Sequence, residues 1–188
     1  MNRLIMITGD IAAGKSTFAR ILANRYQAPS FQKDTIKEIL ANSIGFANRD
    51  ENKKLSNAAV DLMRHIFLQI APSGSSLILE ANFRAAEQEK LLRIAESHQY
   101  DVITLVLRGN ADILYDRYVF RMNEENRHPA HLSTALHIKD NFKKAAESGK
   151  YETYAGHVVN VEASDFSYQT DAVLLELLDR FMGTQISP

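Results

Sequence analysis

The stretch Gly9-Asp-Ile-Ala-Ala-Gly-Lys-Ser16 decides the fold of this chain. It fits the pattern G-x-x-x-x-G-K-[ST] at every defined position. A short aliphatic run, Leu4 to Thr8, precedes it, and a segment with Phe18, Ile21 and Leu22 on one helical face follows it. A strand that turns into a helix in this way points backbone N–H groups and the positive end of the helix dipole at an anion. The sequence therefore predicts a phosphate-binding loop.

Each residue type that the motif defines has an expected task. Gly9 and Gly14 supply backbone torsions that a side chain disfavours. Lys15 would place a positive charge on the β- and γ-phosphates, and the Ser16 hydroxyl would ligate magnesium with Thr17 beside it. We therefore expect ATP and Mg²⁺ as cofactors. The residues predicted to contact the nucleotide here are Gly9, Asp10, Ile11, Ala12, Ala13, Gly14, Lys15, Ser16 and Thr17.

Away from the loop, short β-rich runs alternate with longer helical runs, which is typical of a parallel sheet covered by helices on both faces. The predicted strands are Leu4 to Thr8, a short one near Pro29 to Gln32, Leu77 to Glu80, Val102 to Leu107, and Val158 to Val161. The predicted helices are one after Lys15, Asp34 to Leu40, about Glu51 to Ile70, Arg84 to Ser97, Ala111 to Met122, Leu132 to Ser148, and a last one that includes Val173 to Phe181. We expect a single α/β domain over residues 1–188.

Bulk composition narrows the class of protein. The chain has 188 residues, of which 45% are hydrophobic and 24% charged, as in an ordinary soluble globular protein. Its formal net charge of −1 gives no global attraction to nucleic acid, so we expect no nucleic-acid partner. No apolar stretch approaches the roughly 20 residues of a membrane helix, and the N-terminus does not read as a signal peptide. The lack of cysteine fits a reducing compartment, and we expect a cytoplasmic protein.

Two acids stand where strands end. Glu80 closes the run Leu77 to Glu80, so it is a candidate to hold magnesium or to contact a substrate. Asp34 follows the short second strand and is a candidate catalytic base for an acceptor hydroxyl. The alternative is a purely structural role, in which Asp34 caps the next helix or Thr35 and Glu38 form a capping box there.

Asn82 and Arg84 follow Glu80 closely and are candidate substrate contacts. Asn82 could instead cap the helix that comes next. Further along, Arg117 and Arg121 are four residues apart and share a helix face, and Arg127 lies in the polar excursion Asn123 to His131.

A lid that carries arginines can close on a triphosphate and offset its charge, so Arg121 and Arg127 are candidate catalytic residues together with Lys15 and Asp34. The alternative for the set is pairing with nearby acids, which are Asp112, Asp116, Glu124 and Glu125. The loose spacing of His128, His131 and His137 does not predict a zinc site.

These motifs together resemble a known family. The phosphate loop, Lys33-Asp34, Leu79-Glu-Ala-Asn-Phe83 and Arg117-x-x-x-Arg121 resemble the P-loop kinases of the nucleoside-monophosphate-kinase type. Within them the chain looks most like the small-molecule phosphotransferases, which include chloramphenicol phosphotransferase, the zeta toxins and the kinase domain of polynucleotide kinase.

The resemblance implies a three-layer fold with a five-stranded parallel sheet in the order 2-3-1-4-5 and a lid over about residues 117–131. It suggests Asp34 as the base, Arg117 near adenine, and Arg121 and Arg127 on phosphates. The loop Ala163 to Phe166 would line the adenine pocket.

Three functions stay open on the sequence. The first is a kinase that acts on a hydroxyl of a small molecule, and it is favoured because no clear arginine set for a nucleotide monophosphate lies near Asp34. The second is a nucleoside or nucleotide kinase, for which Arg49, Arg64 and Arg84 would have to move into place. The third is a regulatory ATPase or switch, although the sequence lacks a D-x-x-G motif after the third strand. The acceptor and the oligomeric state are not specified by these motifs.

Overall fold

The computed structural model describes residues 2–124, 127–131, 134–147, 154 and 156–183. At its centre lies a five-stranded sheet in the order β2-β3-β1-β4-β5, and every paired neighbour is parallel. This confirms the predicted order. The strands are β1 (Arg3–Gly9), β2 (Ser30–Gln32), β3 (Leu77–Glu80), β4 (Asp101–Arg108) and β5 (His157–Glu162).

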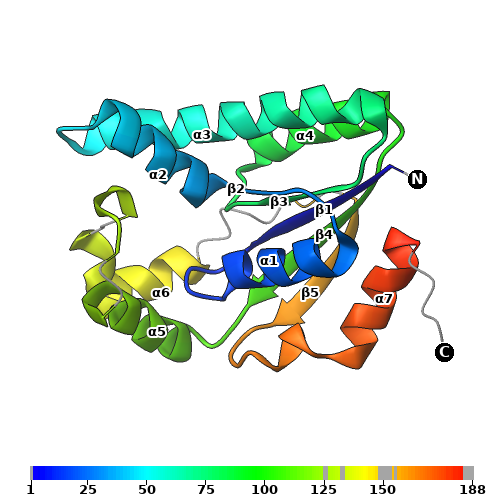
Figure 1. The fold of residues 1–188 in the computed structure, drawn as a ribbon. Coiled ribbons are helices and arrows are strands. Elements are labelled where there is room, and N and C mark those ends of the chain that lie inside the picture. The colour runs from blue at the N-terminus through cyan, green and yellow to red at the C-terminus, as the bar shows by residue number, and fades with distance from the viewer. Residues whose placement is uncertain (1, 125–126, 132–133, 148–153, 155, 184–188) are drawn as a thin grey trace.

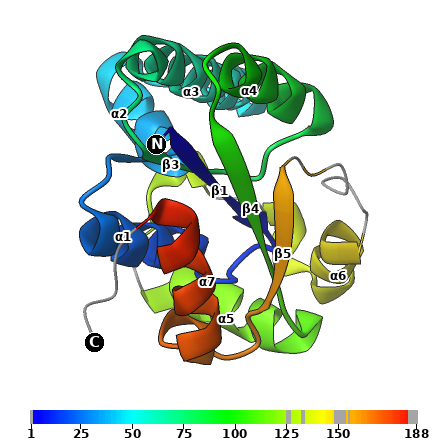
Figure 2. The ribbon, with the colours of Figure 1, turned by 90° about the vertical axis from the view of Figure 1, so that its right-hand side faces the viewer.

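Helices cover both faces of the sheet, which gives three layers (Figure 1). The helices α2, α3 and α4 lie on one side, and α1, α5, α6 and α7 lie on the other, as the turned view in Figure 2 also shows. The helices are α1 (Lys15–Tyr26), α2 (Lys33–Ile44), α3 (Arg49–Ile70), α4 (Ala85–Ser97), α5 (Ala111–Glu124), α6 (Lys139–Glu147) and α7 (Ala172–Met182). Short 3-10 turns are η1 (Ala71–Ser73), η2 (Pro129–His131), η3 (Thr134–His137) and η4 (Ser167–Gln169).

The central strand explains why the sequence reads as an aliphatic run. Successive side chains of a strand point to opposite faces, so β1 serves two cores at once. Ile5 and Ile7 are buried in the cluster on the α1 side, while Leu4 and Met6 are buried in the cluster under α3 and α4. Because both faces are covered, a strand at this place needs apolar residues at every position. The sheet therefore holds the end of β1, and the loop after it, in a fixed place.

One predicted helix begins later than expected. The prediction of a continuous helix from Leu132 to Ser148 is wrong, because α6 starts at Lys139 and η3 is a separate turn before it. The carbonyl of His137 accepts a 2.6 Å hydrogen bond from the Tyr115 hydroxyl, and the His137 ring packs on Tyr118 at 5.8 Å between centroids. These contacts tie η3 to α5, so the chain turns before the helix begins. Residues 132, 133 and 148 lie outside the described residues.

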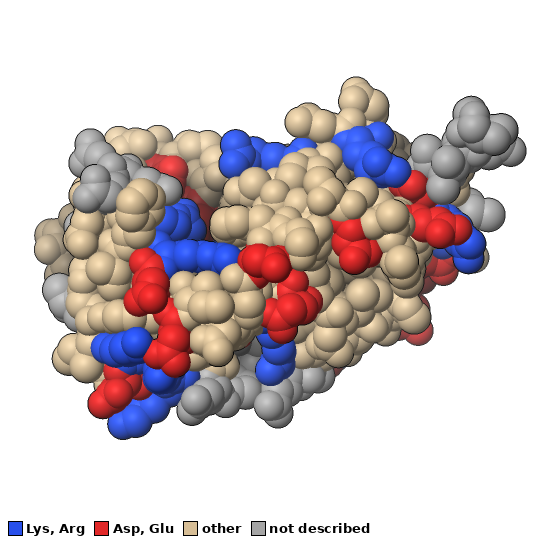
Figure 3. All heavy atoms as spheres, turned by 90° about the horizontal axis from the view of Figure 1, so that it is seen from below, with Lys and Arg blue, Asp and Glu red and all other residues tan. Residues whose placement is uncertain are grey.

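The described surface has mixed charge. On the face seen from below, lysine, arginine, aspartate and glutamate side chains are interspersed (Figure 3). Within the described residues, no helix is both long enough and apolar enough to cross a bilayer.

Candidate active site

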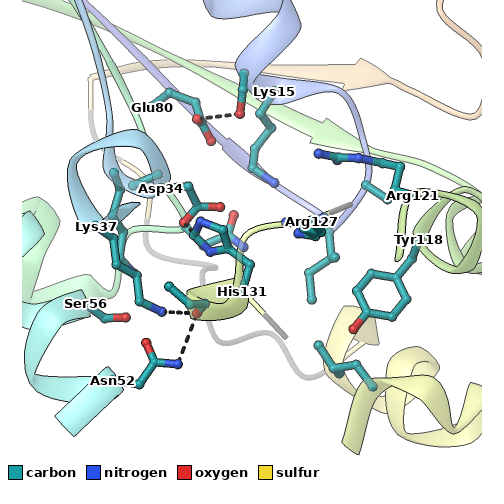
Figure 4. A pocket seen from close by; sticks show the side chains of 18 of the residues that line it. Lys15, Asp34, Lys37, Asn52, Ser56, Glu80, Tyr118, Arg121, Arg127 and His131 are labelled. Carbon is teal, nitrogen blue, oxygen red and sulfur yellow. Dashed lines mark hydrogen bonds and ion pairs between the residues drawn. The ribbon is translucent and has the colours of Figure 1, made fainter. Parts of the chain in front are cut away.

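A cleft of about 1690 Å³ opens at the carboxyl ends of the strands, where ligands bind in open parallel sheets. Its walls come from the β1–α1 loop, α2, α3, the β3–α4 loop, α5, η2 and the loop after β5. Figure 4 shows side chains from α2, α3, α5 and η2 pointing into it. Most predicted site residues meet here, and those that line the cleft are Ile11, Ala12, Gly14, Lys15, Ser16, Thr17, Asp34, Glu80, Asn82, Arg84, Arg117, Arg121 and Arg127.

The two glycines of the phosphate loop have positive φ and no room for a Cβ. Gly9 has φ 123°, and a Cβ there would collide with the carbonyl oxygen of Leu107 on β4. Gly14 has φ 86°, and a Cβ there would lie 2.5 Å from the Tyr168 hydroxyl. That hydroxyl in turn donates a 2.9 Å hydrogen bond to the Ala13 carbonyl. The loop is therefore fixed from two sides, by β4 and by η4.

Lys15 is positioned by the loop itself. Its ammonium donates hydrogen bonds to the carbonyls of Gly9 at 3.2 Å and Asp10 at 2.6 Å. Burial lowers the pKa of Lys15, and the nearby carboxylates of Glu80 and Asp34 oppose that shift. In Figure 4 the Lys15 side chain extends into the cleft.

Three predicted nucleotide contacts do not line the cleft, namely Gly9, Asp10 and Ala13. The Asp10 carboxylate instead accepts a 3.2 Å hydrogen bond from the backbone N–H of Gly109, and burial raises its pKa. Asp10 therefore ties the phosphate loop to the segment between β4 and α5, a supporting task that the motif does not reveal.

Ser16 and Glu80 form an oxygen pair at the edge of the loop. The Ser16 hydroxyl donates a 2.9 Å hydrogen bond to the Glu80 carboxylate, which is only 5% exposed. Burial raises the pKa of Glu80, while Lys15 and the Ser16 hydrogen bond lower it. A hydroxyl and a carboxylate are ligands of the type that Mg²⁺ takes, so this pair fits the metal predicted for the loop.

Asp34 is the second residue of α2, and its side chain is 54% exposed. The cap of this helix is Gln32, which makes no side-chain capping hydrogen bond, so the alternative of Asp34 as N-cap is wrong. The Thr35 to Glu38 capping box is also wrong, because the Thr35 hydroxyl donates to the Gln32 side chain at 3.4 Å. The helix begins at Lys33, two residues before the first helical position that an Asp34 cap requires. Asp34 therefore projects into the cleft (Figure 4).

The turn η2 adds residues that sequence reasoning missed. One ring nitrogen of His131 lies 2.8 Å from the Glu38 carboxylate and the other 3.9 Å from Asp34. The Ala130 carbonyl accepts hydrogen bonds from Lys37 at 2.7 Å and from Asn52 at 3.1 Å. These contacts join residues far apart in the sequence. In the sequence, only the polar stretch around Pro129 indicated that this segment leaves the core.

Arg117 builds a wall on the opposite side of the cleft. Its guanidinium donates to the Ala163 carbonyl at 2.8 Å and to the Ser164 carbonyl, and it stacks 4.2 Å from the ring centroid of Phe166. Arg121 points into the cleft beside Lys15, and Arg127 also points into it (Figure 4). Of the acids named in the pairing alternative, Asp112 accepts from α6, through Lys139 at 2.6 Å and Lys143 at 2.9 Å, and Glu125 lies outside the described residues.

Asn82 and Arg84 lie on the rim after β3. Helix α4 is capped at Arg84, whose backbone N–H donates 2.8 Å to the Glu87 carboxylate, so the alternative of Asn82 as the cap is wrong. The amide oxygen of Asn82 is buried and has no hydrogen-bond partner within the described residues. Across those same residues, no three acidic, histidine or cysteine side chains gather as a metal cluster.

Comparison with solved structures identifies the fold. A protein from Chloroflexus aurantiacus described as a "putative kinase" superposes with a TM-score of 0.81 at 25% identity, covering 94% of this chain and 97% of that one. A shikimate kinase from Bacteroides thetaiotaomicron gives a TM-score of 0.59 at 17% identity over 95% and 97% of the two chains. A gluconokinase from Sinorhizobium meliloti gives 0.55 at 15% identity over 98% of each. The last two likenesses show the fold alone.

The sequence comparisons agree with this. No curated protein matches the chain significantly. The model of the AAA domain family matches residues 4–145, which contain the phosphate loop and every predicted acceptor-side residue. With the superposed kinases, this match confirms the resemblance to small-molecule P-loop kinases. The chain therefore belongs to the AAA domain family and has the fold of a P-loop kinase.

Proposed function

We propose that the protein is an ATP-dependent kinase that transfers the γ-phosphate to a hydroxyl group of a small molecule. The observation that carries this proposal is the placement of an exposed carboxylate, Asp34, in the same cleft as Lys15 and the Ser16–Glu80 pair. Binding of a nucleotide needs the loop, but it does not need an acid across from it. The names of the superposed proteins, which include a shikimate kinase and a gluconokinase, support the same class of reaction.

The part of the cleft at the phosphate loop would bind ATP, the phosphate donor. Backbone N–H groups of the loop and Lys15 would receive the phosphates. The wall made by Arg117 and Phe166 would receive the adenine ring, because a flat aromatic face suits stacking. When bound, Mg²⁺ would offset the charge of the β- and γ-phosphates, and Ser16 and Glu80 would hold it.

The acceptor molecule would bind beside Asp34, and its hydroxyl oxygen would be the nucleophile. As the acceptor oxygen forms a bond to the γ-phosphorus, the bond from phosphorus to the β–γ bridging oxygen breaks, and ADP leaves with that oxygen. Asp34 would accept the proton of the hydroxyl, with the ring of His131 3.9 Å from its carboxylate. Arg121 and Arg127 would offset the charge that spreads over the transferring group.

The test is a coupled assay of ADP release over a panel of sugars, sugar acids, nucleosides, nucleoside monophosphates and antibiotics, with mass spectrometry of each product. Asp34→Asn should lower kcat by about a hundredfold or more, and ATP affinity should be unchanged. Lys15→Ala should abolish transfer with the fold intact. Asp61→Asn, an exposed acid on α3 outside the cleft, is the matched control. Full activity of Asp34→Asn, or ATP hydrolysis without any phosphorylated product, would contradict the proposal.

A further inference from the structure

Beyond Asp34 the cleft ends between α2 and α3, and this end is basic. The side chains that line it are Lys33 and Lys37 from α2, Arg49, Asn52, Lys53 and Ser56 from α3, and the acids Asp34 and Asp50. In the view of Figure 4, Asp34 lies between Lys15 on one side and Lys37, Asn52 and Ser56 on the other. A ligand whose hydroxyl meets Asp34 would therefore extend toward Lys37.

Lys37 is the unusual member of this set. The residue is only 8% exposed, and its ammonium donates one hydrogen bond, to the Ala130 carbonyl. An ammonium carries three N–H donors, and no carboxylate in the described part of the chain forms an ion pair with it. Burying a charge is costly unless it is paired and hydrogen-bonded. Burial accordingly lowers the pKa of Lys37, and the nearby carboxylate of Asp34 opposes that shift only in part.

Arg49 and Lys53 add exposed positive charge next to it. They are four residues apart, so they share one face of α3, and both line the cleft. Within the described residues, neither forms an ion pair. Four cationic side chains against the two carboxylates of Asp34 and Asp50 leave this end of the cleft with an excess of positive charge, and an anion that lies among the cations reduces their mutual repulsion.

We infer that the acceptor is itself an anion, a hydroxylated small molecule with a carboxylate or phosphate group that lies against Lys37, Arg49 and Lys53 while its hydroxyl meets Asp34. This inference rests on the proposed kinase function and names its substrate class. A cationic acceptor such as an amino sugar is disfavoured by the same charges. Lys15, Arg121 and Arg127 would serve the triphosphate, and Lys37 lies on the other side of Asp34 from Lys15 (Figure 4).

The experiment compares acceptors built on one carbon skeleton: a neutral aldose, its aldonic acid, its monophosphate and its amino sugar. We expect transfer to the aldonic acid or the monophosphate with kcat/KM at least about tenfold above the neutral sugar, and none to the amino sugar. The acid and the phosphate ester are separate arms, so the preferred anion is identified.

Two variants test the residues. Lys53→Ala and Arg49→Ala should each raise KM for the anionic acceptor about fivefold and leave KM for the neutral sugar and for ATP unchanged. Lys54→Ala is the matched control, because Lys54 is exposed on the same helix and does not line the cleft. An unchanged KM for the anion in both variants would overturn the inference.

The outcomes separate the two proposals. Equal transfer to neutral and anionic members would refute the anion site and leave the kinase function standing. Absence of transfer to every compound would count against the kinase function. In that event, calorimetry with the same four compounds in the presence of ADP and Mg²⁺ still decides the anion site. Binding of the acid or the ester that weakens in Lys53→Ala supports it, and equal or absent binding overturns it.

Discussion

The hydroxyl of Ser16 donates a 2.9 Å hydrogen bond to the carboxylate of Glu80, although 64 residues separate them in the chain. The sheet brings them together, because β1 pairs directly with β3 and Ile7 lies opposite Glu80 in the register. We predict that Glu80→Gln raises the Mg²⁺ concentration needed for half-maximal ADP release about tenfold, as loss of a supporting carboxylate does at metal sites.

Glu89→Gln is the control for this change, because Glu89 is an exposed glutamate on α4 that lies outside the cleft. A chelator should abolish turnover in the wild type and in both variants. An unchanged Mg²⁺ dependence of Glu80→Gln would show that Glu80 does not support the metal.

The wall of Arg117 and Phe166 should determine nucleotide affinity. Phe166 is 50% exposed and lines the cleft, while Arg117 is fixed behind it by the Ala163 carbonyl. We expect Phe166→Ala to weaken ATP binding about fivefold to tenfold, which corresponds to the loss of one aromatic contact. Calorimetric titration measures it. Phe120→Ala, which removes another exposed ring at the cleft, is a comparison that separates this wall from general loss of apolar surface.

A substitution at Gly9 tests whether the close approach of the phosphate loop to β4 matters for stability. Gly9→Ala should lower the free energy of unfolding by about 3 kcal/mol or more, because the added Cβ would collide with the backbone of Leu107 and φ is positive. Gly183→Ala is the matched control, since Gly183 also has positive φ but open space around it, and it should cost only about 1 kcal/mol. Urea denaturation measures both. Equal losses would mean that strain in φ, and not the collision, sets the cost.

The lowered pKa of His131 predicts that the free energy of unfolding depends on pH. Burial lowers its pKa from the usual 6.5, the carboxylates of Asp34 and Glu38 oppose this, and the charges of Lys37 and Arg127 reinforce it. The unfolded chain therefore binds the proton more readily than the folded protein does. The contribution of His131 to stability is complete above about pH 6.5 and is lost as the pH falls through the lower folded pKa.

The variant His131→Asn should accordingly show a shallower decline in the free energy of unfolding between about pH 7 and pH 5 than the wild type. Urea titrations at several pH values measure the slope. His65→Asn, at an exposed position on α3, should leave the slope unchanged. A wild-type slope in His131→Asn would show that this histidine does not take up the proton.

The fold was predictable because one contiguous motif and a few aliphatic runs specify it. The run Leu4 to Thr8 is apolar at nearly every position, which only a strand covered on both faces requires, and the loop after it fixes the start of α1. The start of α6 was not predictable, since it depends on the contact of His137 with α5, which is a tertiary interaction.

The residues of the site also fall into those that the sequence predicts and those that depend on tertiary contacts. Lys15 and Ser16 are adjacent in the sequence, so their shared task could be recognised from the motif. The hydrogen bonds of Lys37 and Asn52 to Ala130 join three distant segments, and no local pattern announces them. The role of Asp34 as a helix cap was wrong for a local reason, because α2 begins at Lys33.

The sheet order has a consequence for how such proteins diversify. β1 lies between β3 and β4, so the residues proposed to choose the acceptor come from the β2–β3 side, and the wall proposed for adenine comes from beyond β4. Substitutions on α2 and α3 can therefore change which compound is recognised while the nucleotide-binding half keeps its geometry. A lineage with this architecture can gain new substrates by altering one helical pair, and the costly backbone approach at Gly9 never has to be rebuilt.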